Sequence, residues 1–560
     1  MEPAAPLSYV FFIFTVGFAI VAIYELRRKR LFLAHVPGPR SGHFLLGNLP
    51  LLSRSPATEV RQLLRPSFAF SEFYLKVDFN WYRKYGGTAK FTGAFGEQHL
   101  MISDPKAVQY IMQTAGYGFV RPSDRKEASR LLLGQGVLTV EGDDHKRQRR
   151  MLLPSFGSLE ANTFVPSFAS KAAQMADEWA EMIHDGNSAV DVPSWVARAT
   201  LDAIGEAAFD IQFNALTDSS NELVKVYSNL FTKTRRSPSN LEIFMAESLG
   251  LVPTPLMRWW NDTVPNRKRA FVKRCRLVAE GVAKDLVQEK RSAEKNGQDE
   301  KGTLSRGKCA NDVLSRLVHA NGTADAKVRL GEDELLAQLL TILLAGHETT
   351  ANSLSWALLE LSQQPHVQAR LRAEIRAVRL ERKEPELTAT AIHSMPYLSA
   401  VVKEVLRFHA PVYNTSRTAM RDDVIPLSRP LYDTQGRPVH EVMVPKGQKV
   451  LISIAAFNRD KDIFGADADR FDPERWLKEG YVSKRAGVGP YSSLLTFGGG
   501  HRACLGWRFA VLELSAFLVE LVDRFEFSVN PAMKVHRGAA SIMIPMIEGE
   551  LDKGCSYRCM

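Results

Sequence analysis

Apolar residues along this chain recur mainly with a helical period. Long stretches such as residues 335–361 and 507–525 place them every three to four positions, whereas strand-like runs such as residues 89–92 and 449–452 are short. The pattern predicts a mainly helical body with small β-sheets. Residues 335–361 predict a helix of about 27 residues, roughly 40 Å long at 1.5 Å per residue, which is enough to cross the molecule.

Residues 1–30 predict a single membrane anchor. Residues 7–24 are almost wholly apolar, and the basic residues 27–30 follow them, while Glu2 is the one charge that precedes them. The positive-inside rule then leaves the N-terminus outside and the rest of the chain in the cytosol, as in a single-pass protein of the endoplasmic reticulum membrane. The alternative is a cleaved signal peptide, which normally carries basic residues before its apolar stretch and small residues after it.

Two further segments predict loops. Residues 31–50 contain Pro37 and Pro39, which prevent the helix from continuing and predict a stiff, proline-rich hinge; an ordinary linker is the alternative. Residues 288–307 are rich in Lys, Arg, Glu, Ser and Gly and predict a solvated loop between helices.

The apolar segment 241–260 has two interpretations. One is a helix of the core, and the other is a second surface that dips into the membrane. The adjacent Trp259 and Trp260 favour the second interpretation, because tryptophan is enriched at the membrane interface.

Composition and charge narrow the class of protein. A chain of 560 residues with 45% hydrophobic and 24% charged residues is a globular protein, which excludes wholesale disorder and fibrous repeats. The 72 Lys and Arg exceed the 62 Asp and Glu by 10, which suits an anionic membrane surface or an acidic protein partner, and we expect no nucleic-acid partner. Five scattered cysteines are too few for a disulfide framework and indicate a reducing compartment.

The strongest chemical signal lies in residues 496–506, where three successive glycines precede Cys504. Glycines let the backbone approach a flat ligand closely. Cys504 lies where the helix over residues 507–525 is expected to begin, so the free N–H groups there and the positive charge of Arg502 favour a thiolate. A phosphate-binding loop would need a following Gly-Lys-Ser/Thr, which the sequence lacks. A buried structural cysteine remains the alternative for this residue alone.

The same segment matches the pattern Phe-x-x-Gly-x-Arg-x-Cys-x-Gly at Phe497, Gly500, Arg502, Cys504 and Gly506. It thereby resembles the haem-binding loop of cytochrome P450 monooxygenases. The resemblance implies that Cys504 is the axial ligand of the iron in haem b and that Arg502 pairs with a haem propionate. It also implies the cytochrome P450 fold, a triangular helical prism around haem, with residues 51–560 forming one catalytic domain after the transmembrane helix.

Residues 345–350, Ala-Gly-His-Glu-Thr-Thr, place an acid and hydroxyls in the middle of the long apolar helix. Burying such groups is costly without a purpose, and Gly346 leaves room for something to approach the backbone. The segment is similar to the oxygen-binding helix of the family, which implies that Thr349 steadies dioxygen and that Glu348 relays protons from solvent. Polar positions on an exposed helix face are the alternative.

Glu404 and Arg407 lie three residues apart on one expected helix and can pair. Together with Arg475 in the later Phe-Asp-Pro-Glu-Arg-Trp segment, they resemble the Glu-x-x-Arg helix and Pro-Glu-Arg loop of the family. The resemblance implies a buried charged triad that serves folding and haem retention.

Residues 142–154 resemble the Trp-x-x-x-Arg helix of the family, with His145 in place of the tryptophan. The resemblance implies that His145 and Arg149 bind a haem propionate, and Arg417 resembles another propionate-binding arginine. Other basic residues nearby form either a solvated face or a docking surface for an acidic reductase domain; they are Lys146, Arg147, Arg150 and Arg508.

The resemblance implies an enzyme that oxidises a small molecule with O₂ and electrons from NADPH. The electrons would arrive through NADPH–cytochrome P450 reductase, with cytochrome b5 as a second candidate partner, because no dinucleotide-binding motif is evident. Two alternatives are an oxygen-independent isomerase or dehydratase acting on a hydroperoxide, which would not need Glu348 and Thr349, and a non-catalytic haem-binding sensor.

The expected substrate is lipophilic, because the segments expected to line its site are mainly apolar; they are residues 121–136, 241–260, 343–344, 412–416 and 541–544. The proline hinge, the His145 replacement and residues 427–430 resemble fungal microsomal members of the family. This resemblance suggests secondary metabolism, with a terpenoid or sterol-like substrate as first choice and fatty acids or aromatic compounds as alternatives.

Overall fold

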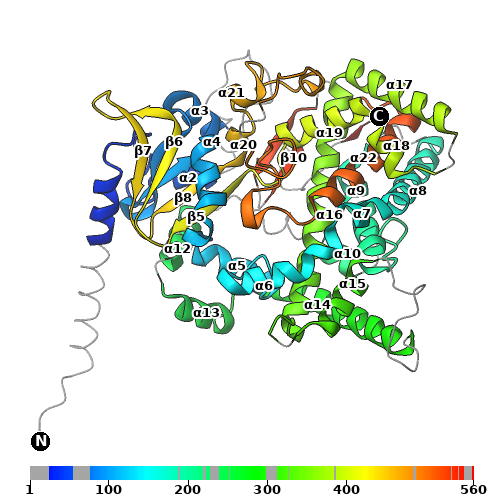
Figure 1. The fold of residues 1–560 in the computed structure, drawn as a ribbon, viewed down its shortest axis with the longest axis horizontal. Helices are drawn as coiled ribbons and strands as arrows, with labels where there is room; N and C mark the ends of the chain where they lie inside the picture. The colour runs from blue at the N-terminus through cyan, green and yellow to red at the C-terminus, as the bar shows by residue number, and fades with distance from the viewer. Residues whose placement is uncertain are drawn as a thin grey trace, which may run out of the picture.

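The structure is a computed structural model of the full chain. It describes residues 24–53, 76–186, 189–218, 222–227, 239–250, 252–297, 312–325, 327–383, 386–483, 487–530, 533–539, 542–547 and 558–559. Within them helices dominate and the sheets are small, as the hydrophobic pattern predicts. In Figure 1 most strands lie together on one side of the molecule, and the long helices fill the other side.

Most of the described chain is helical. A first helix covers residues 24–32. The others are α2 (Leu49–Ser53), α3 (Lys76–Tyr85), α4 (Pro105–Gln109), α5 (Ser123–Leu133), α6 (Gly142–Leu152), α7 (Ser158–Thr163), α8 (Val165–His184), α9 (Val192–Ile204), α10 (Glu222–Tyr227), α12 (Asn240–Gly250), α13 (Thr254–Thr263), α14 (Arg267–Gly297), α15 (Val313–Thr323), α16 (Glu332–Gln363), α17 (Pro365–Arg382), α18 (Ala389–His393), α19 (Pro396–Phe408), α20 (Ile454–Phe457), α21 (Lys461–Phe464) and α22 (Trp507–Arg524).

Helix α16 is the long central helix that the sequence predicts. It has 32 residues, and leucines on all its sides are buried because α9, α14, α19 and α22 pack around it. Gly346 is needed for one of these contacts: a Cβ at this position would lie 2.7 Å from Cδ1 of Ile204 in α9. The group that approaches the backbone at Gly346 is therefore a neighbouring helix.

The main sheet has five strands in the order β1-β2-β8-β5-β3, of which β2 and β8 are parallel and the other pairs antiparallel. The two strand-like runs of the sequence fall in β1 and β8. Three further sheets have two strands each: β6 with β7, β9 with β10, and β4 with β11. The strands are β1 (Thr88–Thr92), β2 (Gln98–Ile102), β3 (Phe119–Val120), β4 (Val190–Asp191), β5 (Asn414–Ala419), β6 (Asp423–Tyr432), β7 (Pro438–Val444), β8 (Lys449–Ser453), β9 (Val535–Ala539), β10 (Met543–Ile547) and β11 (Arg558–Cys559).

Two sequence predictions need correction. The loop predicted over residues 288–307 is wrong in its first half, because α14 continues to Gly297; residues 298–311 lie outside the described part. Lys, Arg and Glu are good helix formers, so a charged segment can extend a helix into solvent. The core-helix interpretation of residues 241–260 is also wrong, because α12 and α13 are short and expose much of their apolar surface.

The predicted anchor is not tested by the structure, because residues 1–23 lie outside the described part. Among the described residues, no helix combines the length and the apolar character that crossing a membrane requires. The predicted hinge lies against the main sheet: Val36 is buried, and the Lys90 N–H donates to the Pro37 carbonyl at 2.9 Å.

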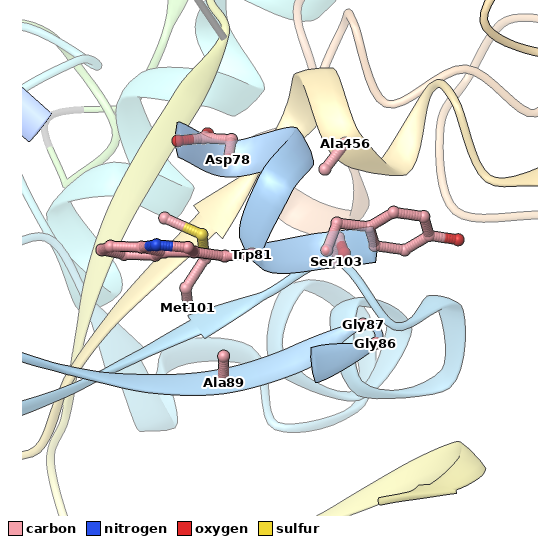
Figure 2. Close-up of a pocket in the computed structure, with 9 residues that line it drawn as sticks. Asp78, Trp81, Gly86, Gly87, Ala89, Met101, Ser103 and Ala456 are labelled. Atoms are coloured by element: carbon pink, nitrogen blue, oxygen red, sulfur yellow. The ribbon is translucent and has the colours of Figure 1, made fainter. Parts of the chain in front are cut away.

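A small cavity of about 10 Å³ lies between α3, α20 and the first two strands (Figure 2). Its lining includes Asp78, whose pKa is raised to about 6 because the carboxyl is buried, although Ser453 donates to it at 2.7 Å. A volume of this size holds about one water molecule, so this cavity is too small for a substrate or cofactor.

Candidate functional site

The loop before α22 has the close backbone approaches that its glycines predict. Gly498 and Gly500 have φ angles of +69° and +62°, a region that favours glycine. A Cβ on Gly500 would lie 2.0 Å from the Met112 carbonyl oxygen. The Cys504 N–H donates to the Phe497 carbonyl at 2.8 Å, which closes the loop and fixes where the cysteine side chain begins.

Cys504 is surrounded by protein atoms, yet part of its surface is accessible to solvent. Burial raises the pKa of its thiol, while the Gly506 N–H, which hydrogen-bonds to the sulfur, and the charge of Arg149 lower it. Burial thus opposes the thiolate that the start of α22 and the nearby arginines favour. A bound metal cation would reverse this balance, since a coordinating thiol is deprotonated.

Helix α16 offers polar groups in the middle of its buried length. The Thr349 hydroxyl donates to the Ala345 carbonyl at 2.8 Å, and the helix continues through this turn without a break. Ala345 is exposed and Thr349 half-buried, so the i and i+4 positions of one helix face are accessible where the neighbouring turns are buried. Glu348 is largely buried and lies 3.5 Å from the His347 ring.

Four arginines from separate elements converge near Cys504. They are Arg121 before α5, Arg149 on α6, Arg417 on β5 and Arg502 in the loop that holds the cysteine. Burial, together with the charges of Arg121 and Arg502, lowers the pKa of Arg417 to about 9. Burial and Arg502 likewise lower the pKa of Arg121 to about 10. In the described part of the chain, the carboxylate that opposes these charges is Glu141, which pairs with Arg502.

His145 lies on α6 beside the same cluster and is buried. Burial, Arg502 and Arg149 lower the pKa of His145 to about 3, so the ring is neutral. Its Nδ1 lies 2.6 Å from the Tyr117 hydroxyl, and the Tyr117 ring lies 4.2 Å from the ring of His501.

Sequence reasoning missed three members of this group: Tyr117, Arg121 and His501. His501 stands at a variable position of the cysteine motif, and Arg121 begins a segment expected to line the substrate site. Tyr117 carries no sequence signal, because only folding brings it next to His145.

The residues fit haem b. Haem carries two negatively charged propionates and an iron that accepts a thiolate ligand. The structure provides an exposed Cys504 and, nearby, guanidinium groups whose mutual repulsion is relieved, among the described residues, by the carboxylate of Glu141. An anionic ligand would supply the missing negative charge.

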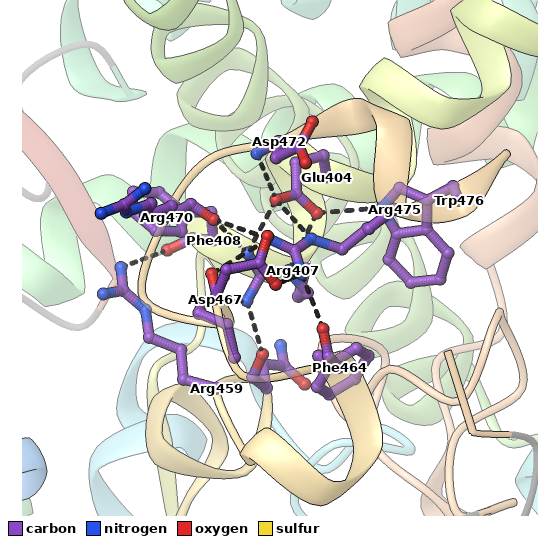
Figure 3. Close-up of polar contacts among 12 residues, drawn as sticks. Glu404, Arg407, Phe408, Arg459, Phe464, Asp467, Arg470, Asp472, Arg475 and Trp476 are labelled. Carbon is purple, nitrogen blue, oxygen red and sulfur yellow. Dashed lines mark hydrogen bonds and ion pairs between the residues drawn. The ribbon is translucent and has the colours of Figure 1, made fainter. Parts of the chain in front are cut away.

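The predicted charged triad comes together in the core (Figure 3). Glu404, Arg407 and Arg475 are fully buried, and the Glu404 carboxylate accepts from Arg407 at 2.7 and 2.9 Å and from Arg475 at 3.0 Å. The indole of Trp476 and the backbone N–H of Asp472 also donate to it, at 2.9 and 2.7 Å. Burial raises the pKa of Glu404, but Arg407 and Arg475 lower it by more. The net shift is downward, so the carboxylate is ionised.

Of the basic residues considered for docking, Lys146 and Arg150 are exposed. Arg147 instead turns toward α16 and donates to Glu334 at 3.0 Å. Arg508 stacks on the Trp507 ring, with its guanidinium carbon 4.1 Å from the ring centre. The exposed basic surface is therefore smaller than the sequence suggests.

Known proteins match most of this chain. Residues 67–549 match the family model described as Cytochrome P450. The chain is 32% identical to Cytochrome P450 monooxygenase 205 of Postia placenta over 547 residues, which covers 96% of this chain and 94% of that protein. It is also 32% identical to Cytochrome P450 monooxygenase claP of Ampulloclitocybe clavipes over 480 residues, 84% of this chain and 85% of that protein. The chain belongs to the cytochrome P450 family, and it is a monooxygenase whose cofactor is haem b.

Proposed function

We propose that this enzyme is anchored in the endoplasmic reticulum membrane by residues 1–30 and hydroxylates a lipophilic small molecule. In this proposal residues 31–50 form the hinge, and residues 51–560 form one cytosolic catalytic domain. The observation that carries the proposal is the exposed Cys504 close to a cluster of four arginines, among which the described carboxylate is Glu141.

Haem held by Cys504 supplies the activation of O₂ and the insertion of one oxygen atom into a C–H bond. The residues of this chain hold and orient it. Arg502, Arg149, Arg417 and His145 bind the propionates, whereas Phe497, Gly500 and Gly506 shape the loop that presents the sulfur. The triad of Glu404, Arg407 and Arg475 fixes the packing around the site and so retains the cofactor.

Thr349 and Glu348 handle protons in this proposal. The accessible hydroxyl of Thr349 holds a proton at Oγ1, and its hydrogen bond to the Ala345 carbonyl fixes its direction. The Glu348 carboxylate, on the preceding position of α16, exchanges protons between the site and solvent.

The exposed apolar residues of α12 and α13 support contact with the membrane. They are Leu241, Met245, Leu256, Trp259 and Trp260. Paired tryptophans on a short exposed helix suit the interface between lipid and water. A lipophilic substrate would then enter from the membrane, with a terpenoid or sterol-like skeleton of secondary metabolism as the first candidate and fatty acids or aromatic compounds as alternatives.

Members of this family generally take electrons from redox partners such as a reductase. For this chain we propose NADPH–cytochrome P450 reductase, with cytochrome b5 as a second donor. The exposed Lys146 and Arg150 suit an acidic partner surface.

The direct test is mass spectrometry of lipophilic products from membranes that contain the full chain and a reductase. We expect a product heavier by one oxygen atom that requires NADPH and O₂. Product formed from a hydroperoxide without NADPH, or ligand binding without any product, would contradict the proposal.

Two variants test the site. Cys504→Ala should abolish the carbon-monoxide difference band of the reduced enzyme, whereas Cys275→Ala, which removes a buried cysteine of α14, should keep it. Thr349→Ala should keep the band but divert electrons to peroxide. Its matched control is Thr341→Ala, because that hydroxyl makes the same bond to the carbonyl four residues before, at 2.7 Å. Normal hydroxylation by Thr349→Ala would contradict the proton-handling role.

A further inference from the structure

Tyr117 connects three parts of the candidate haem site. It lies in a short turn over Gly116–Gly118, and its hydroxyl is 2.6 Å from Nδ1 of His145 on α6. Its ring packs against His501 in the loop before Cys504, at a centre-to-centre distance of 4.2 Å. No catalytic or binding role for Tyr117 follows from the sequence motifs.

The direction of the hydrogen bond follows from the surroundings. Burial raises the pKa of the Tyr117 phenol, although Arg502 and Lys146 oppose this, so the phenol keeps its proton and can donate. His145 lies among cations and is neutral, which leaves it one N–H and one acceptor nitrogen. A hydroxyl that donates to Nδ1 places the ring proton on Nε2. Among the described residues, the hydrogen bond given to this ring is the one at Nδ1, and Nε2 is then the nitrogen that can donate.

We propose that Tyr117 is a positioning residue that holds His145 in the Nε2–H form, so that His145 donates to a haem propionate. This inference rests on the proposed haem site. It also explains how histidine can serve at the place where the Trp-x-x-x-Arg motif has tryptophan. An indole has one N–H in a fixed place, whereas a neutral imidazole can carry its proton on either nitrogen and needs a partner to choose.

The test uses four forms of the haem-loaded full chain: wild type, Tyr117→Phe, His145→Trp and the double variant. The rate at which each loses haem to excess apomyoglobin is measured, together with the propionate bending mode in resonance Raman spectra. Phenylalanine keeps the ring against His501 and removes only the hydroxyl. We expect Tyr117→Phe to lose haem about five- to tenfold faster, the value of one ordinary hydrogen bond, and to shift the bending mode.

The His145→Trp background tests whether Tyr117 acts through the tautomer of His145. An indole has one N–H in a fixed place, so it needs no partner to select it. There, Tyr117→Phe should change neither the rate of haem loss nor the Raman mode. Tyr110→Phe is the matched control: it removes another tyrosine hydroxyl bond, from Tyr110 to Asp423 at 2.7 Å, and should leave both measurements unchanged.

Two results would overturn the inference. One is an unchanged rate of haem loss in Tyr117→Phe. The other is an equal effect of Tyr117→Phe in the wild-type and His145→Trp backgrounds, which would mean that Tyr117 acts on the propionate or on His501 directly. The proposed haem site fails separately, and earlier in the experiment, if wild type binds no haem or lacks the thiolate carbon-monoxide band.

Discussion

Two groups of buried arginines in this molecule differ in how their charge is balanced. Arg407 and Arg475 share the Glu404 carboxylate, and each of their guanidinium nitrogens also has an acceptor, among them the carbonyls of Ala468 and Phe464 at 2.6 Å. Arg417, by contrast, donates to Thr415 and the Ser416 carbonyl. Its positive charge is repelled by those of Arg121 and Arg502.

This difference separates a structural cluster from a binding cluster. A buried ion pair whose hydrogen bonds are all made within the protein is complete and has nothing left to offer a ligand. A group of cations with lowered pKa values is costly to the protein alone and becomes favourable only with an anion present. For these two groups the balance of charge supports the proposal that Arg407 and Arg475 serve the fold and that Arg417 helps to bind the cofactor.

The largest expected effect comes from breaking the complete cluster. Glu404→Gln removes the charge that Arg407 and Arg475 share and leaves two guanidinium groups buried without it. We expect a loss of about 3–5 kcal/mol in the free energy of unfolding, measured by thermal or denaturant unfolding of the holoenzyme. Glu222→Gln is the control, since its exposed pair with Arg274 contributes at most about 1 kcal/mol. Equal stability of the two variants would contradict the structural role.

The second prediction breaks the incomplete cluster, and its sign depends on haem. Arg417→Met removes a cation from a repulsive group, so protein produced without haem should gain about 1 kcal/mol in the free energy of unfolding. The same variant should lose haem faster, because a propionate partner is gone. Denaturant unfolding without haem and haem transfer from the holoenzyme measure the two effects, with the exposed Arg437→Met as control. A destabilised haem-free protein would mean that Arg417 is structural.

How far the sequence predicts these features depends on the range of the interactions. The span of α16 and the closure of the Cys504 loop follow from local patterns, namely a continuous apolar period and glycines that permit positive φ angles. The extension of α14 to Gly297 was missed because a charged segment suits both a loop and an exposed helix.

Other features depend on contacts between distant parts of the chain. The absence of a side chain at Gly346 is explained by Ile204, which packs against it from a helix far earlier in the chain. The pKa of the Cys504 thiol depends on burial by the whole domain, which outweighs the start of α22. The contact of Tyr117 with His145 joins a turn to α6, and no motif of the sequence contains both residues.

The third effect concerns pH: it is negligible at pH 7, develops only on acidification, and sharpens the comparison without altering the arginines. His145 has a pKa of about 3 in the folded protein, against 6.5 for an unperturbed histidine. Below pH 6.5 the unfolded chain therefore binds a proton that the folded chain does not, so stability is lost as the pH falls from 6.5 toward 3, by at most about 1.4 kcal/mol per pH unit. Without haem, His145→Phe should reduce this loss, whereas the exposed His184→Phe should not. In the holoenzyme a propionate beside His145 would raise its pKa and shrink the difference between wild type and His145→Phe. Unfolding curves at pH 7, 6 and 5 with and without haem measure this difference, and an identical pH dependence in both forms would mean that no anion reaches His145.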